Sequence, residues 1–132
     1  MSKYMAFESE AFASAPLLVD ALHEIGFKDV IQGDCLLLQG WDKRDARTAD
    51  IVIRRSDVKD HRLLGDIGFQ KTPKGYVAVI DDMDLNYSLG KDFIKRLQTQ
   101  YHEAAARKMA TKLGGTLIRE HIGKTIKIRV KF

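Results

Sequence analysis

The longest helical pattern in the chain covers residues 89–114, and it constrains the fold more than any other segment. Its apolar side chains recur at the spacing of one helix face: Phe93, Ile94, Leu97, Tyr101, Ala104, Ala105 and Met109. Ser88 is a candidate N-cap, and Gly114 or Gly115 is a candidate C-terminal stop. Such a wide apolar face requires a partner surface. The rest of the chain supplies one, because most of it has the pattern of β-strands.

A shorter helix is predicted between Ser14 and Gly26. Pro16 suits a first helical turn, and apolar residues recur at helical spacing until the glycine. Gly26 followed by Phe27 is typical of a left-handed helix end in which the next apolar side chain folds back onto the helix.

The remaining apolar segments predict β-strands. They are residues 3–9, 35–39, 51–54, 65–70, 76–80, 116–121 and 125–132. Pro73 and Gly75 supply a turn between the fourth and fifth of these, and residues 122–124 join the last two as a closing hairpin. The expected fold class is α+β, in the order β-α-β-β-β-β-α-β-β. It is a mainly antiparallel sheet with two helices packed on one face.

Length and composition favour one domain, residues 1–132, in a reducing compartment. No apolar run approaches the ~20 residues of a membrane span. The first residues lack the apolar segment of a secretory signal, and a single cysteine forms no internal disulfide. We therefore expect a cytoplasmic protein, or one of the plastid stroma or of a phage-infected host. Cys35 begins an apolar run and is expected to be a small core residue.

Several fragments resemble enzyme motifs but lack a necessary member. The segment 123–125 has no glycine five residues earlier to complete a phosphate-binding loop, since Ile118 stands there. His102 and Glu103 lack the second histidine of a zinc-protease helix, because residue 106 is Ala106. We therefore expect no catalytic residue, no metal ligand and no cofactor. Asp81, Asp82 and Asp84 are interpreted as a solvated turn before the long helix, with a magnesium or calcium site as the alternative.

The net charge of +4 is unevenly distributed. Residues 1–34 carry two basic and six acidic side chains, so the rest of the chain carries a net charge of +8. This division can indicate an anionic partner, although it also occurs in ordinary basic proteins. The candidate contacts for an anion or a nucleic acid are Arg54, Arg55, Arg119, Lys127, Arg129 and Lys131. Alternatively, such lysines protect a sheet edge from aggregation.

Short segments spread over nearly the whole chain resemble one protein family. They are residues 49–53, 65–69 and 76–81, the segment 97–114 around Gln100 and Tyr101, and a closing strand that ends in an aromatic residue. Together they are similar to the conserved hypothetical chloroplast reading frame family numbered thirty-five, which includes cyanobacterial, plastid, bacterial and phage members and carries a domain-of-unknown-function label. Phe132, where relatives tend to have tryptophan, and the basic stretch 54–62 depart from that pattern. The resemblance implies a compact α+β domain and brings no activity, cofactor or catalytic residue.

These observations favour a non-enzymatic binding or adaptor protein with a basic sheet face, whose partner is a protein or a nucleic acid and not a membrane. A second hypothesis is an enzyme or small-ligand protein with a carboxylate-lined pocket near Asp66, Asp81, Asp82 and Tyr101. A third is a homo-oligomer that pairs through an edge strand.

Overall fold

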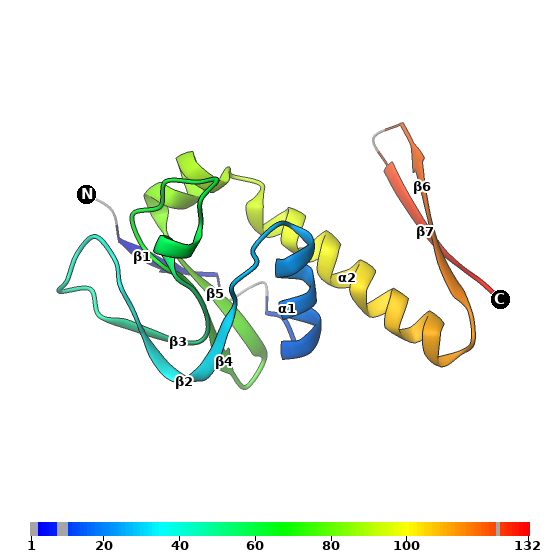
Figure 1. Ribbon diagram of the computed structural model, residues 1–132, viewed down its shortest axis with the longest axis horizontal. Coiled ribbons are helices and arrows are strands. Elements are labelled where there is room, and N and C mark those ends of the chain that lie inside the picture. Colours follow the sequence, from blue (N-terminus) through cyan, green and yellow to red (C-terminus); the bar gives the residue numbers. More distant parts are fainter. Residues whose placement is uncertain (1–2, 8–10, 124) are drawn as a thin grey trace.

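The computed structural model describes residues 3–7, 11–123 and 125–132, and it has the predicted α+β architecture (Figure 1). Five strands form an antiparallel sheet in the order β1-β5-β4-β3-β2. Their bounds are β1 Tyr4–Ala6, β2 Ile31–Leu38, β3 Arg47–Ile53, β4 Ile67–Thr72 and β5 Gly75–Asp81. A 3₁₀ turn (η1, Arg55–Asp57) follows β3. The element order predicted from the sequence is confirmed.

Two helices, α1 (Ala15–Glu24) and α2 (Phe93–Lys112), pack on one face of this sheet. The core between the layers joins helix residues such as Leu18 and Leu97 to strand residues such as Ile51, Phe69 and Ile80. Burying apolar side chains from both layers is the main stabilising contribution to such a fold.

The helix α1 begins and ends where its sequence pattern predicts. The Ser14 hydroxyl accepts a hydrogen bond from the Leu17 N–H at 3.4 Å. At the other end, Gly26 has a φ of 112°, and the Phe27 N–H donates to the Leu22 carbonyl at 3.0 Å. Phe27 is buried against the core, as expected for an apolar residue that follows a left-handed helix end.

The helix α2 begins four residues later than residue 89, where the pattern places its start. A single π-helical turn (η2, Asp84–Leu89) precedes it, and the Ser88 hydroxyl donates to the Arg62 carbonyl instead of capping α2. The predicted stop is confirmed, because Gly114 has a φ of 76° and the Gly115 N–H donates to the Ala110 carbonyl at 2.7 Å.

The predicted apolar face of α2 is only partly buried. Phe93, Ile94 and Leu97 are buried, whereas Met109 is 64% exposed, which corrects the expectation for that residue. The reason is visible in Figure 1, where the second half of α2 extends past the sheet. A polar residue, Glu103, is buried there instead.

A smaller apolar cluster lies on the other face of the sheet and joins residues of β1, β2, β3 and β5. It contains Tyr4, Leu38, Ala49, Val52 and Val79. A Cβ atom at Gly68 would lie 2.8 Å from the side chains of Leu38 and Ala49, so this strand position requires glycine.

The strand β2 has an irregularity that the sequence pattern did not indicate. Its pairing with β3 shifts register between Gln32 and Leu36, and Cys35 takes a φ of 49° within this bulge. Cys35 is exposed, so the expectation of a core cysteine is wrong. The bulge turns this residue outward, because it interrupts the alternation of side chains between the two faces.

The strands β6 (Thr116–Ile122) and β7 (Thr125–Lys131) pair as the predicted closing hairpin, but they form a two-stranded sheet of their own. We call this hairpin the arm. It lies beside the second half of α2, at the end of the molecule away from β1 (Figure 1). None of the described helices is long and apolar enough to cross a membrane.

Candidate functional site

Three buried carboxylates lie together at one end of the five-stranded sheet. Asp66 immediately precedes β4, Asp81 ends β5, and Asp84 begins the π-helical turn, and each is 1% exposed. The antiparallel register places the start of β4 beside the end of β5, and Tyr4 of β1 pairs with Asp81. The expectation of a solvated acidic turn is therefore wrong for Asp81 and Asp84.

Asp66 accepts three hydrogen bonds from two other parts of the chain. Its Oδ2 atom accepts hydrogen bonds from the Gln39 N–H at 2.8 Å and from the Arg54 guanidinium at 2.7 Å, and its Oδ1 atom accepts from the Arg55 N–H at 2.8 Å. Hydrogen bonds to an ionised carboxylate are among the stronger ones in proteins. The side chain of Asp66 therefore ties the end of β2, the end of β3 and the start of β4 to one another.

Asp84 holds the loop before β4 in the same manner. Its two carboxylate oxygens accept from the Leu64 N–H at 2.8 Å and the Gly65 N–H at 3.0 Å. Burial raises the pKa of Asp84 above its ordinary value, and these two backbone donors oppose the rise. The Oδ1 atom of Asp81 accepts from the Asp84 N–H at 3.2 Å, so it orders the first residues after β5.

The phenol of Tyr4 lies among these carboxylates. Its hydroxyl is buried and has no hydrogen-bond partner among the described residues. Burial raises the pKa of this phenol first, and the negative charges of Asp66 and Asp81 raise it further. The hydroxyl approaches Gly65 so closely that a Cβ atom at that position would lie 2.6 Å from it.

The second hypothesis placed four residues around one pocket, and the structure brings only two of them together. Asp66 and Asp81 share the buried cluster, whereas Asp82 lies on the surface side and accepts from the Lys3 N–H at 3.0 Å. Tyr101 lies in the helical layer, where its hydroxyl accepts from the Ser14 N–H at 2.9 Å and its ring packs on Phe12. The buried carboxylates are engaged by N–H donors and act as structural clamps.

The sequence grouped Asp66 with Asp81 in the second hypothesis, but it did not indicate that these carboxylates and Asp84 bind the backbone, because hydrogen bonding to the backbone leaves no periodic signal. One indication was available: Asp81 directly follows a run of apolar residues, 76–80, and a residue that continues a buried strand is itself often enclosed.

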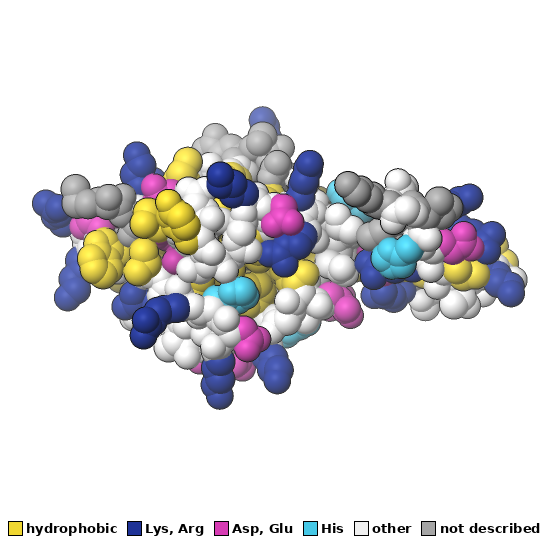
Figure 2. All heavy atoms as spheres, turned by 90° about the horizontal axis from the view of Figure 1, so that it is seen from above, with side chains coloured by type: hydrophobic (Ala, Val, Ile, Leu, Met, Phe, Trp, Pro, Cys, Tyr) yellow, Lys and Arg dark blue, Asp and Glu magenta, His cyan; other side chains and the backbone are white. Residues whose placement is uncertain are grey.

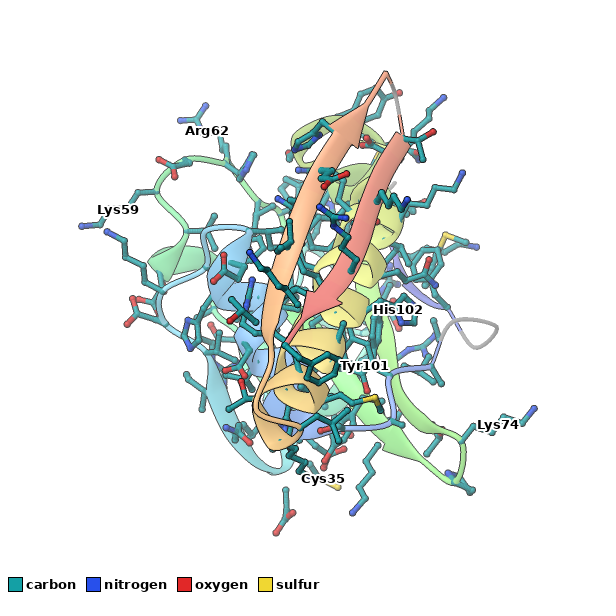
Figure 3. All side chains as sticks on the ribbon, turned by 90° about the vertical axis from the view of Figure 1, so that its right-hand side faces the viewer. Cys35, Lys59, Arg62, Lys74, Tyr101 and His102 are labelled. Carbon is teal, nitrogen blue, oxygen red and sulfur yellow. The ribbon has the colours of Figure 1, made fainter. Side chains whose placement is uncertain are left out.

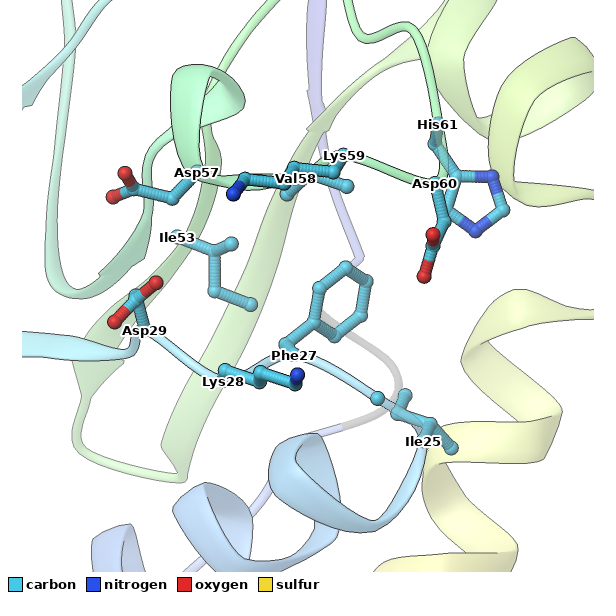
Figure 4. Close-up of a pocket in the computed structure, with 11 residues that line it drawn as sticks. Ile25, Phe27, Lys28, Asp29, Ile53, Asp57, Val58, Lys59, Asp60 and His61 are labelled. Carbon is cyan, nitrogen blue, oxygen red and sulfur yellow. The ribbon is translucent and has the colours of Figure 1, made fainter.

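A separate pocket of about 250 Å³ lies between the loop after α1 and the loop after η1 (Figure 4). Phe27, Ile53 and Val58 provide its apolar lining. Around them lie charged or titratable side chains of both signs: Lys28, Asp29, Asp57, Lys59, Asp60 and His61. Figure 4 shows Asp29 and Asp57 on one side and Asp60 and His61 on the other. Carboxylates and positively charged groups alternate here, so the pocket does not select for one sign of charge.

The predicted basic contacts are divided between two regions of the molecule. Arg54 and Arg55 belong to the carboxylate end of the sheet, where the Arg55 guanidinium donates to the Leu64 carbonyl at 2.6 Å. The other four residues lie on the arm, whose register pairs Arg119 with Ile128 and Ile118 with Arg129. Side chains alternate between faces, so Lys127, Arg129 and Lys131 share one face of the arm and Arg119 lies on the other.

Arg119 faces α2, because its guanidinium pairs with the buried carboxylate of Glu103. Arg107, one helical turn after Glu103, donates to the other carboxylate oxygen at 3.4 Å. A buried carboxylate with two guanidinium partners attaches the arm to the helix. Lys127, Arg129 and Lys131 are exposed.

No group of three or more histidine, cysteine or acidic side chains is placed to hold a metal ion within residues 3–7, 11–123 and 125–132. The arm, by contrast, presents three exposed cations, Lys127, Arg129 and Lys131, on a two-stranded β-ribbon.

Fold and site define a small α+β protein with a basic two-stranded arm. Comparison with known families then gives a match over residues 21–130 to the family described as "Protein of unknown function (DUF1257)". The chain belongs to this family. No curated protein and no solved structure matches it.

Proposed function

We propose that this chain is a non-enzymatic nucleic-acid-binding protein and that the arm is its contact element. The observation that carries the proposal is the row of three exposed cations, Lys127, Arg129 and Lys131, on one face of a two-stranded ribbon. Successive members of the row lie about 6.6 Å apart along the strand. The major groove of duplex DNA admits a two-stranded β-ribbon, and lysine and arginine neutralise its phosphates.

The distribution of charge supports this surface over the rest of the molecule. Of the 22 basic and 18 acidic residues of the chain, 11 basic and three acidic residues lie between positions 91 and 132, a net charge of +8. The preceding 90 residues therefore carry a net charge of −4. Figure 2 shows Lys and Arg side chains around the arm at one end of the molecule. A phosphate backbone is attracted to this end and repelled by the acidic remainder.

Arg129 is partly neutralised within the arm, because its guanidinium lies 2.6 Å from the Glu120 carboxylate. Both side chains of that pair are accessible to solvent, and exposed pairs of this kind are weak. A phosphate group that binds Arg129 therefore displaces Glu120 at a small cost in free energy. Phe132, 77% exposed beside Lys131, supplies an aromatic ring for stacking on a base.

The test measures binding of a short fluorescein-labelled DNA duplex, and of the corresponding single strand, by fluorescence anisotropy. The arm variant K127Q/R129Q/K131Q should bind the duplex at least about tenfold more weakly than the wild type. The matched control K59Q/K71Q/K74Q removes the same amount of charge from exposed positions outside the arm. Its affinity for the duplex should stay within about twofold of the wild-type value. Figure 3 shows Lys59 and Lys74 projecting away from the arm.

Equal weakening by the two triple variants would overturn the assignment to the arm. Absence of salt-sensitive binding to either form of DNA, and to RNA of the same sequence, would overturn the proposal itself.

A further inference from the structure

The helices α1 and α2 pack side by side on the sheet, and a groove of about 530 Å³ lies between their exposed sides. Its α1 side is formed by Leu17, Asp20, His23 and Glu24. Its α2 side is formed by Ala104, Arg107, Lys108, Thr111 and Lys112. The groove takes in about two helical turns of each wall.

The two walls carry opposite charge. Asp20 and Glu24 are exposed on α1 and lie four residues apart, so their carboxylates follow one row of that helix. Lys108 and Lys112 are exposed on α2 with the same spacing. No ion pair crosses from α1 to α2 within the described part of the chain. The acidic row and the basic row can therefore both form ion pairs with a bound partner.

The base of the groove accepts apolar side chains. Leu17 is half-buried and Ala104 is buried, and the small side chain of Ala104 allows close approach to the backbone of α2. The methylene stems of Arg107, Lys108 and Lys112 extend this apolar surface while their charged groups reach solvent.

We propose that this groove docks an amphipathic helix of a partner protein, with about two turns in contact. The edge of that helix facing α1 carries lysine or arginine, and the edge facing α2 carries aspartate or glutamate. Small apolar residues lie between the two edges and meet Leu17 and Ala104. This arrangement is the helix-in-groove mode of recognition, and it goes beyond the nucleic-acid function proposed for the arm.

Charge complementarity selects this occupant over a nucleic acid. A phosphate chain placed in the groove would be attracted by Lys108 and Lys112 but repelled at a similar range by Asp20 and Glu24. A helix satisfies both walls, because residues at i and i+4 align along each of its edges with the spacing that both walls display. The groove and the arm therefore suit different partners.

The test uses a displayed library of helix-forming peptides, randomised along the two edges and the central row of the helix. Peptides that bind the immobilised protein are selected from this library. We expect enrichment of peptides with one basic edge, one acidic edge and small apolar residues between them. The affinity of the best peptide is then measured by fluorescence anisotropy. The groove variants D20N/E24Q and K108Q/K112Q should each weaken it about tenfold, as expected for the loss of two charge pairs beside an apolar contact.

The control K91Q/K95Q removes two exposed lysines, one just before α2 and one in its first turn, outside the groove, and should leave the affinity within about twofold. A selection without such enrichment, or a best peptide whose affinity neither groove variant changes, would overturn the proposal. The D20N/E24Q variant should also bind DNA at least as well as the wild type, so failure of the groove is separable from failure of the arm.

Discussion

The carboxylate of Asp66 lies almost entirely away from water, and its three N–H donors are what make that placement stable. An Asp66→Asn substitution keeps the shape but replaces one acceptor oxygen with a donor that faces other donors. It also leaves the Arg54 guanidinium without its carboxylate. We expect the free energy of unfolding to fall by about 3 kcal/mol, measured by urea denaturation.

The control for this prediction is Asp60→Asn in the exposed loop before β4, which should change the free energy of unfolding by no more than about 0.5 kcal/mol. A similar small effect at Asp66 would show that its hydrogen bonds contribute little to the folded state.

Asp84 gives the fold a pH dependence whose sign follows from its raised pKa. A carboxyl group with a raised folded-state pKa binds its proton more tightly in the folded protein than in the unfolded chain. Its contribution to stability is therefore full below the ordinary value of 3.8 and is lost as the pH rises through the raised pKa. We therefore compare the free energy of unfolding of the wild type with that of Asp84→Asn. The difference between them should fall as the pH rises from 3.8 through the raised pKa, and it should stay level at higher pH.

The measurement is a series of urea denaturations from acid to neutral pH on the wild type, Asp84→Asn and the exposed control Asp60→Asn. The substitution at Asp84 also removes an acceptor from the Leu64 or Gly65 N–H, which shifts its whole curve by a constant. Wild-type and Asp84→Asn curves that run parallel through the acid range would contradict the raised pKa.

At the scale of elements, the sequence pattern predicts most helices and strands because their apolar residues face a common core. The end of α1 at Gly26 and the end of α2 at Gly114 follow from backbone conformations that glycine adopts most easily. The start of α2 was misplaced because Leu89 belongs to the π-helical turn, and Gly90, with a φ of 98°, separates that turn from the helix.

The position of the arm was not predictable from local pattern. The strict alternation in β7 indicates a strand with one apolar face, but not where the hairpin lies relative to the five-stranded sheet and the helices. The attachment to α2 depends on a pair between Glu103 and Arg119, which lie 16 residues apart and occupy different elements. The hydrogen bonds that make clamps of Asp66 and Asp84 were not predictable for the same reason, since their partners are distant in sequence.

This attachment yields a prediction about the arm as an element. A two-stranded sheet is at best marginally stable alone, so β6 and β7 depend on their contact with α2. Glu103→Gln removes the buried negative charge shared by Arg107 and Arg119 and should lower the local free energy of opening of the arm by about 2 kcal/mol. Amide hydrogen exchange in residues 116–122 should accelerate while that of β4 and β5 stays unchanged. The control is Glu120→Gln, which breaks a more exposed pair within the arm.

The opposite result would be equally informative about the arm. If Glu103→Gln left exchange in β6 at the wild-type rate, the ion pair between Glu103 and Arg119 would be dispensable for holding the arm beside α2.

At the scale of the whole molecule, residues 1–90 carry a net negative charge, and α2 and the arm carry a net positive charge. The position of a cation should therefore affect DNA binding more than the net charge of the chain does. Each phosphate neutralised on duplex DNA contributes a slope of about −0.9 to the dependence of log affinity on log salt concentration. Arg129 is partly neutralised by Glu120, so K127Q/R129Q/K131Q should make the slope shallower by about two. Anisotropy titrations at several salt concentrations measure both slopes.

K59Q/K71Q/K74Q has the same net charge and should keep the wild-type slope, because those side chains do not meet the phosphates. Equal slopes for the two variants would mean that overall charge, and not the arm, governs association.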